Sequence, residues 1–272
     1  MADDKSLHID VRGIISSKNS RVARRIPRFV IRYLEKILHQ DELNKFLDER
    51  PGVENMDFVR ECISYMELGI EYSGFENIPK DGRFVFASNH PLGGLESAVL
   101  MDVVSRKFDD FVFVVNDLLM ALKPVNDLFV PVNKVGSQSR ESVDKVNAAY
   151  SSDKQILFFP AGLVSRKVKG KIVDPTWQKS FVSKAVETKR DIIPVYIDGR
   201  NSNFFYRLAQ FRKFFRIKMN VEMLYLVNET FKQKGRTIKI VFGEPIPYTH
   251  FDKSQTYLQW AEYLKNKVYS LK

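Results

Sequence analysis

The pattern of hydrophobic and polar positions changes near residue 80. In the upstream part, apolar residues recur at helical spacing with arginines between them, most clearly over residues 22–38, where Pro27 can set the true start of the helix. Residues 55–69 show a second helical pattern that ends near Gly69. We therefore predict an N-terminal helical segment over residues 1–72.

Downstream, short apolar runs alternate with helical patterns. The runs predict strands at 83–88, 111–115, 128–132, 155–160, 191–197 and 237–243, and the patterns predict helices at 95–107, 116–123, 138–152, 177–189 and 254–270. Buried strands joined through helices are typical of a largely parallel sheet. Residues 73–272 are thus predicted to form an α/β domain with a mostly parallel central sheet flanked by helices, which binds ligands beyond the carboxyl ends of its strands.

One predicted strand end carries candidate chemistry. His90 lies in the turn after the run at 83–88, Gly93 and Gly94 follow, and Glu96 falls in the first turn of the next predicted helix. A carboxylate bonded to one imidazole nitrogen fixes the tautomer and leaves the other nitrogen free to accept a proton. At this point the pair is open to two interpretations, a general base or a helix-start carboxylate beside a structural turn histidine.

Other predicted strands end in polar or cationic groups as well. The run at 128–132 leads into Asn133 and Lys134, and the run at 155–160 leads through Gly162 to Ser165 and Arg166. These side chains are suited to binding a phosphate or a carboxylate. A purely structural explanation accounts for the apolar halves of these segments but not for their polar tails.

Composition and charge narrow the classes of function. The single cysteine, Cys62, excludes a disulfide framework, and four scattered histidines give no zinc-site spacing, so we expect no metal. Residues 151–218 contain 15 Lys and Arg against 5 Asp and Glu, so the segment has a net charge of +10. This equals the net charge of the whole chain. A basic excess confined to one segment indicates an anionic partner. Nucleic acid is not expected, because no known nucleic-acid-binding motif is present.

The order of these motifs resembles the PlsC-like glycerolipid acyltransferases, also called the lysophosphatidic acid acyltransferase superfamily. Their hallmark is Asn-His, four residues and then Asp. Here Asn89 and His90 match, while the carboxylate comes one residue later as Glu96. The spacing His-Pro-x-Gly-Gly-x-Glu is similar to that of the hemolysin-like, or aminolipid, branch of the superfamily.

Three further motifs extend the resemblance over about residues 75–245. The second is matched by Val132, Asn133 and Lys134, the third by Phe159, Pro160, Gly162, Ser165 and Arg166, and the fourth by Ile193, Pro194 and Val195. Ala161 stands where the third motif has a glutamate. The resemblance implies substrate-binding roles for Asn133, Lys134, Gly162, Ser165 and Arg166.

The resemblance also implies a reaction. His90 would take the proton from an acceptor hydroxyl that attacks an acyl thioester, Glu96 would orient His90, and backbone N–H groups near Gly93 and Gly94 would stabilise the oxyanion. The expected co-substrate is acyl carrier protein or a coenzyme A thioester, with no bound cofactor. The expected acceptor is a lysophospholipid or an N-acylated amino-acid lipid.

The segment 200–220 combines phenylalanines with cations. As a helix it places Phe204, Leu208, Phe211 and Phe215 on one stripe, which suits an anionic membrane surface or, alternatively, packing on the sheet with a solvated basic rim. The same cations suit the acidic surface of a carrier protein. Because no run approaches the roughly 20 apolar residues of a membrane span, we expect a cytoplasmic protein attached peripherally to the inner face of the cytoplasmic membrane.

Two functions of different classes remain at this point. The first is an acyltransferase that esterifies the hydroxyl of a single-chain lipid. The second is a catalytically silent module that binds lipid or acyl carrier, for which the displaced carboxylate and Ala161 are the motivation. Loss of thioester in the presence of acceptor distinguishes them.

Overall fold

The structure is a computed structural model that describes residues 8–18, 25–132, 140–217 and 219–272. Two compact units are present: one comprises Met1–Val53 with Ser202–Lys232, and the other comprises Glu54–Asn201 with Gln233–Lys272. The second unit contains the sheet and is called the sheet unit below. The first is called the helical unit. The predicted division of the chain at residue 72 stays a prediction.

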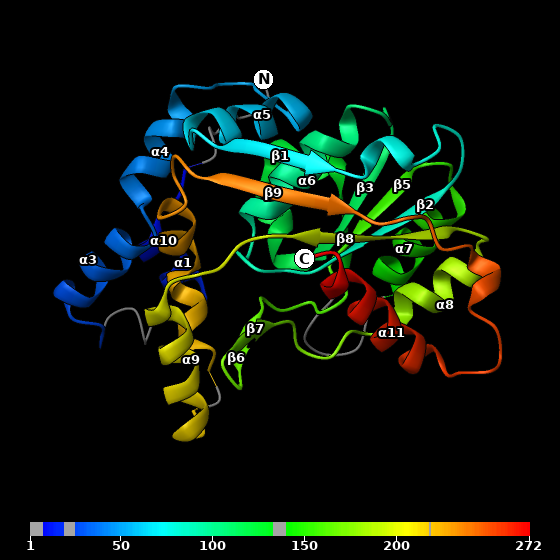
Figure 1. The fold of residues 1–272 in the computed structure, drawn as a ribbon. Coiled ribbons are helices and arrows are strands. Elements are labelled where there is room, and N and C mark those ends of the chain that lie inside the picture. The colour runs from blue at the N-terminus through cyan, green and yellow to red at the C-terminus, as the bar shows by residue number, and fades with distance from the viewer. Residues whose placement is uncertain (1–7, 19–24, 133–139, 218) are drawn as a thin grey trace. The chain divides into compact units, whose positions relative to one another are not determined.

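The sheet unit is built on one large sheet. Within the described residues its seven strands are β1 (Gly69–Ser73), β2 (Phe84–Ser88), β3 (Phe111–Asn116), β4 (Phe129–Val132), β5 (Gln155–Phe158), β8 (Asp191–Ile197) and β9 (Thr237–Phe242). They lie in the order β1-β9-β8-β2-β5-β3-β4, and every neighbouring pair is parallel except β8 and β9 (Figure 1). The predicted α/β class with a mostly parallel sheet is confirmed.

Helices cover both faces of this sheet, which explains why its strands are continuous apolar runs. They are α5 (Asn55–Tyr65), α6 (Leu95–Ser105), α7 (Arg140–Ser151), α8 (Ser180–Glu187) and α11 (Tyr257–Ser270). On β2, Phe84 and Phe86 pack edge to face on Phe108, just after α6. Val85 and Ala87 belong instead to the core that contains residues of α8 and α11. Figure 1 shows these two helices on the same side of the sheet.

Strand β2 is central and its carboxyl end carries the predicted turn. Its residue Phe86 is paired with Leu157 of β5 on one side and with Ile193 of β8 on the other. Since these strands are parallel, their carboxyl ends meet at one edge of the sheet. His90 follows β2 directly at this edge.

The boundaries of some elements differ from the predictions. Helix α5 ends at Tyr65, and Gly69 begins β1 instead of ending a helix, because the segment pairs with β9. Residues 117–121 form a short 3-10 helix, η2, where an α-helix over 116–123 was predicted. A small hairpin of β6 (Arg166–Val168) and β7 (Lys171–Val173) was not predicted. The remaining 3-10 turns of this unit are η1 (Phe75–Asn77), η3 (Lys123–Leu128) and η5 (Tyr248–His250).

The helical unit joins segments that are far apart in the sequence. Its elements are α1 (Val11–Lys18), α3 (Arg28–Ile37), α4 (Gln40–Asp48), α9 (Asn203–Phe214), η4 (Val221–Tyr225) and α10 (Leu226–Phe231). The hydroxyls of Tyr33 and Tyr225 lie 2.7 Å apart and link α3 to the segment after α9. Among the described helices of the chain, none has both the length and the apolar character needed to cross a membrane.

The structure of helix α9 disagrees with one of the two alternatives for the basic, aromatic segment, namely packing through the predicted stripe. Its buried residues are Phe205, Tyr206 and Ala209. The stripe predicted from the spacing is instead largely exposed, with Phe204 at 48%, Phe211 at 55% and Phe215 at 56% exposure. The phenylalanines of this stripe therefore do not form the packed face of the helix.

Candidate active site

The turn between β2 and α6 brings a histidine and a carboxylate together. Gly93 has φ +100°, a conformation that residues with a Cβ rarely adopt, and this lets the chain reverse within a few residues. Helix α6 then starts at Leu95, so that Glu96 lies in its first turn, where the helix dipole favours a carboxylate. From there the side chain of Glu96 reaches back over the turn.

Glu96 is fully buried and holds the imidazole of His90. Its Oε1 lies 2.9 Å from Nδ1 of His90 and also accepts the backbone N–H groups of Leu92 (2.8 Å) and Gly93 (2.9 Å). Its Oε2 accepts the N–H of Gly94 at 2.8 Å. Because an ionised carboxylate only accepts hydrogen bonds, Nδ1 must carry the proton, and Nε2 is left as the basic nitrogen of the ring.

The electrostatics of Glu96 favour its ionised form. Burial opposes ionisation, but the charge and hydrogen bond of His90, together with the N–H groups of Gly93 and Gly94, outweigh burial and lower the pKa of Glu96. The carboxylate therefore stays charged beside the ring. A charged partner stabilises the imidazolium that forms when Nε2 accepts a proton.

A second buried carboxylate holds the backbone of the same histidine. Oδ1 of Asp174 accepts the N–H of His90 at 3.2 Å and the hydroxyl of Ser165 at 2.6 Å, and Oδ2 accepts the indole N–H of Trp177 at 2.9 Å. The carbonyl oxygen of His90 accepts the N–H of Ser165 at 2.8 Å. Burial raises the pKa of Asp174 despite these hydrogen bonds. The turn is thus fixed on the side away from Glu96 as well.

Asn89 ties this turn to the neighbouring strand. Its side-chain amide donates to the carbonyl oxygen of Ile197 (2.9 Å) and accepts the N–H of the same residue (2.7 Å). Asn89 is 2% exposed, so the bonds satisfy backbone groups that water does not reach. These two bonds therefore fix the position of the His90 turn relative to the end of β8.

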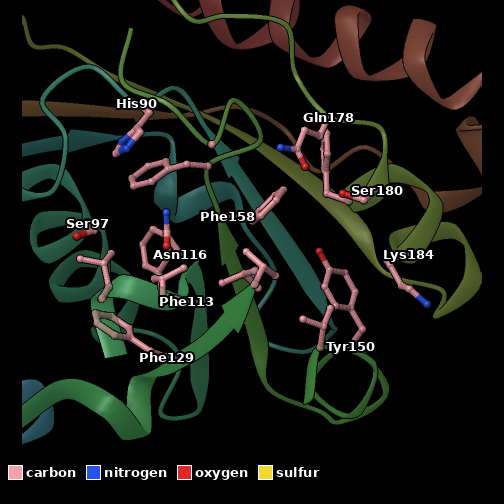
Figure 2. Close-up of a pocket in the computed structure, with 18 of the residues that line it drawn as sticks. His90, Ser97, Phe113, Asn116, Phe129, Tyr150, Phe158, Gln178, Ser180 and Lys184 are labelled. Atoms are coloured by element: carbon pink, nitrogen blue, oxygen red, sulfur yellow. The ribbon is translucent and has the colours of Figure 1, made fainter. Parts of the chain in front are cut away.

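An apolar pocket of about 290 Å³ opens beside His90. The imidazole forms one wall, stacked on Phe159 with 4.3 Å between ring centroids. Most of the lining is hydrophobic and comes from β3, β4, β5, α7 and α8, including Phe113, Phe129, Val146, Phe158 and Phe181. Figure 2 shows His90 on one side of the pocket and Tyr150 and Lys184 on the opposite side. Such a lining suits a hydrocarbon chain.

The predicted glycines lie at this pocket. Gly93, Gly94 and Gly162 all contribute to its lining. The N–H groups of Gly93 and Gly94, however, are bonded to Glu96, and that of Gly162 donates to the carbonyl oxygen of Phe159 at 3.0 Å. The suggested use of the Gly93 and Gly94 N–H groups for an oxyanion disagrees with these bonds, because both donors are already engaged.

Ser165 and Arg166, two other predicted substrate-binding residues, do not line this pocket. Ser165 is 1% exposed and its hydroxyl donates to Asp174, a placement that disagrees with the predicted contact to a substrate. Arg166 begins β6, where its guanidinium donates to the carbonyl oxygen of Val164 at 2.9 Å. Asn133 and Lys134 lie outside the described residues.

Two residues important for the turn were missed from the sequence, Asp174 and Trp177. Asp174 lies between β7 and α8 in a segment without secondary structure, so no periodicity indicated its burial. Trp177 was predicted to start a helix over 177–189, but α8 begins only at Ser180. The available signal was an aspartate before proline with a tryptophan three residues later. Among the described residues, no group of three or more His, Cys, Asp or Glu side chains is arranged to hold a metal ion.

A histidine held by a buried carboxylate at the mouth of an apolar pocket is suited to activating a hydroxyl for transfer of an acyl group. Comparison with known proteins assigns this same class. An acyltransferase family model matches residues 13–272, and the chain belongs to this family. The predicted membership in the PlsC-like acyltransferase superfamily is confirmed, and the protein is an O-acyltransferase.

Two relatives are similar over their whole length. A lyso-glycine lipid O-acyltransferase of Bacteroides thetaiotaomicron is 46% identical over 272 residues, which cover 100% of both chains. A lyso-glycine lipid O-acyltransferase of Phocaeicola vulgatus is 43% identical over 272 residues, which cover 100% of this chain and 98% of the relative. These relatives exclude the interpretation of the chain as a catalytically silent binding module.

A solved structure is also similar, the crystal structure of the 1-acyl-sn-glycerophosphate (LPA) acyltransferase PlsC from Thermotoga maritima. The TM-score is 0.49 at 19% sequence identity, and the alignment covers 95% of this chain and 88% of that chain.

Proposed function

We propose that the protein transfers a fatty acyl group from an acyl thioester to the hydroxyl of a single-chain lipid that carries an amide-linked glycine. The names of the two relatives support this acceptor. The observation that carries the proposal is the bond between Nδ1 of His90 and Oε1 of Glu96 at the edge of an apolar pocket. The pair of His90 and Glu96 supplies a base for the hydroxyl, and the pocket supplies a hydrophobic site for an acyl chain.

The chemistry follows from the tautomer of His90. Nε2 takes the proton as the acceptor oxygen attacks the carbonyl carbon of the thioester. When the tetrahedral intermediate collapses, the carbon–sulfur bond breaks and the imidazolium returns the proton to the departing thiolate. The products are an ester and a free thiol, so no covalent enzyme intermediate and no bound cofactor are required.

The acyl chain is assigned to the pocket beside His90. Its wall of valine and phenylalanine side chains removes a hydrocarbon chain from water, which contributes about 0.8 kcal/mol for each buried CH₂ group. Phe159 positions the imidazole by stacking and also faces the pocket, so the same ring links acyl binding to the base. The thioester donor is acyl carrier protein or coenzyme A.

The test is acyl transfer from a radiolabelled thioester to a panel of acceptors, with wild type beside His90→Ala. We expect transfer to the glycine lipid with a free hydroxyl and a loss of about 10²–10⁴-fold in the variant, the usual contribution of a general base. A lysophospholipid and an N-acyl glycine without a hydroxyl are the acceptor controls. A folded His90→Ala protein with wild-type turnover would contradict the role of the histidine.

The lipid acceptor of the proposed reaction belongs to a membrane, and the helical unit supplies a surface suited to membrane binding. Phe211, Phe214 and Phe215 are 55%, 79% and 56% exposed, and the last turn of α9 also contains Arg212 and Lys213. On α3, Phe29 is 73% exposed beside basic side chains. Exposed aromatic side chains with cations around them are suited to the interface of an anionic bilayer.

The membrane proposal is tested with Phe211→Ser combined with Phe214→Ser. We expect the double variant to lose sedimentation with anionic liposomes, while wild-type binding weakens as salt is raised. The control is Tyr257→Ser with Leu258→Ser, which changes two exposed apolar residues of α11 in the sheet unit. Equal binding of wild type to neutral and anionic liposomes would contradict the proposed role of the basic side chains in membrane binding.

A further inference from the structure

A second hollow lies on the other side of the His90 turn. This groove, of about 990 Å³, is lined by residues of the turn, of the β6–β7 hairpin, of the segments around β8 and β9, and of α11. Its lining includes Asn89 and Pro91, the residues that flank His90, whereas His90 itself lines the apolar pocket. The turn therefore separates an apolar pocket from a groove of different character.

The groove is cationic. Five basic residues line it, and the acidic residues in its lining are Asp198 and Glu262. The basic residues are Lys171, Arg200, Arg236, Lys265 and Lys272. They come from different segments of the chain, so their convergence is produced by the fold and was not visible as a run in the sequence. A concave surface with an excess of one charge attracts the opposite charge.

Four of the five groove cations have no carboxylate partner among the described residues, whereas several other cations of the sheet unit do. Lys145 lies 2.7 Å from Glu141, Lys154 lies 2.8 Å from Asp110, and other exposed cations are paired in the same way. In the described part of the chain, no ion pair joins Arg200 or Arg236 to a carboxylate, and the same holds for Lys171 and Lys272. Their charges are available to a ligand.

Lys265 is the most enclosed of the five. Its side chain is only 14% exposed, and its ammonium nitrogen lies 3.8 Å from Oε2 of Glu262, a carboxylate that is itself 52% exposed. Taking an ammonium group out of water is costly unless a close anion compensates. A distance of 3.8 Å is too long for a hydrogen bond, so an anion in the groove would complete the environment of this group.

We propose that this cationic groove binds the phosphate-bearing part of the acyl thioester donor. The inference rests on the proposed function, because the donor must present its thioester to His90 with the acyl chain in the apolar pocket. The thiol of either expected donor ends a pantetheine arm, and the arm carries phosphate at its other end. An extended arm that crosses the turn places this phosphate in the groove.

The shared ligand chemistry is thus a phosphate ester attached to pantetheine. In coenzyme A the phosphates belong to a nucleotide, and in an acyl carrier protein one phosphodiester joins the arm to a serine. Lys265 with Arg236 and Arg200 can form charge-assisted hydrogen bonds to either. The test measures the two donors separately.

The experiment compares wild type with Lys265→Gln combined with Arg236→Gln. Initial rates are measured with acyl-coenzyme A, with acylated carrier protein and with acyl-pantetheine, which has the arm without phosphate. We expect the KM for at least one phosphate-bearing donor to rise by about tenfold or more, with kcat nearly unchanged, because charge-assisted bonds to phosphate are lost. For acyl-pantetheine, kcat/KM should be unchanged.

Two further proteins separate groove charge from folding and from total charge. Lys171→Gln with Arg200→Gln alters two exposed groove residues, and we expect a smaller rise in the same KM. The control, Lys145→Gln with Lys154→Gln, removes two positive charges from the same unit outside the groove and should leave the KM unchanged.

Direct binding keeps this inference distinct from the proposed function. The affinities of unacylated coenzyme A and of carrier protein bearing phosphopantetheine are measured by calorimetry, without turnover. Weaker binding by the groove variant supports the groove even if the glycine lipid is not the acceptor. The proposal is overturned if wild type binds neither, if acyl-pantetheine loses activity equally, or if the KM for the lipid acceptor rises while that for the donor does not.

Discussion

The two sides of the His90 turn are held by different chemistry. On the side of the apolar pocket, Glu96 grips the imidazole side chain and has a lowered pKa. Next to Val173 and Ser165, which line the cationic groove, Asp174 binds the backbone N–H of His90 and has a raised pKa. Both carboxylates are buried, so burial alone does not decide whether a carboxylate stays charged.

The difference follows from what each carboxylate faces. Glu96 has a partner that becomes positively charged during the proposed reaction, so its ionised form is useful to the chemistry. Asp174 faces neutral donors, namely the hydroxyl of Ser165, the indole of Trp177 and a peptide N–H. One carboxylate tunes a proton acceptor, and the other fixes a loop.

Replacing Glu96 with Gln removes the charged partner of His90 and has the largest expected effect. The carbonyl oxygen of an amide can still accept hydrogen bonds, but a neutral amide cannot stabilise the charged ring, and its NH₂ group would meet the backbone N–H donors. We expect kcat to fall by about 10²–10⁴-fold with KM for both substrates nearly unchanged. Steady-state kinetics measure this, and a fall of less than threefold would contradict the role of the carboxylate.

Replacing Asn89 with Ala tests the attachment of the turn to β8. The change leaves the N–H and carbonyl groups of Ile197 without their partner in a buried position. We expect the free energy of unfolding to fall by about 2–4 kcal/mol, as is usual for two buried unsatisfied groups. Urea denaturation measures it, with Asn220→Ala, an exposed change in the helical unit, as the control.

The pH dependence of stability distinguishes the two carboxylates. The pKa of Glu96 is lowered from 4.5, so its contribution to stability is fully present above that value and is lost as the pH falls through the lowered pKa. The deficit of Glu96→Gln relative to wild type should therefore be largest near pH 7 and shrink in acid. Urea unfolding between pH 7 and the lowest pH at which the protein stays folded measures the trend.

Asp174→Asn should show the opposite trend and the smallest effect. The pKa of Asp174 is raised from 3.8, so its protonated form is favoured in the folded state, and this contribution is lost as the pH rises through the raised pKa. We expect a deficit of about 1–2 kcal/mol in acid that narrows toward neutral pH. Asp144→Asn, on the exposed face of α7, is the control. If the stability deficits of Asp174→Asn and Glu96→Gln changed with pH in the same direction, the proposed difference between the two carboxylates would be wrong.

Much of the sheet was predictable because burial on both faces leaves a plain signal. The runs that became β2, β3, β5 and β8 are apolar at successive positions, and their parallel arrangement then placed His90 at the correct edge. Strand β1 was not predicted, because its residues are partly exposed and it lies at the edge of the sheet. Its pairing with β9 is a long-range contact without a local pattern.

The candidate site was predictable only where it depends on local spacing. His90 and Glu96 are six residues apart, so the turn and the helix start were enough to bring them together. The positions of Ser165 and Asp174 depend on how a distant loop packs against the turn. In the sequence, a polar segment after a strand looks the same whether its side chains face solvent or the interior. The cations of the groove are spread along the chain from Lys171 to Lys272, and no local pattern connects them.

The grip of four donors on Glu96 also has a kinetic consequence. A carboxylate engaged by His90 and by the N–H groups of Leu92, Gly93 and Gly94 has little affinity for a further proton. The proton taken from the acceptor therefore stays on the imidazole until the sulfur leaves. In mixtures of light and heavy water, the rate of acyl transfer should then vary linearly with the deuterium fraction, the signature of a single proton in flight.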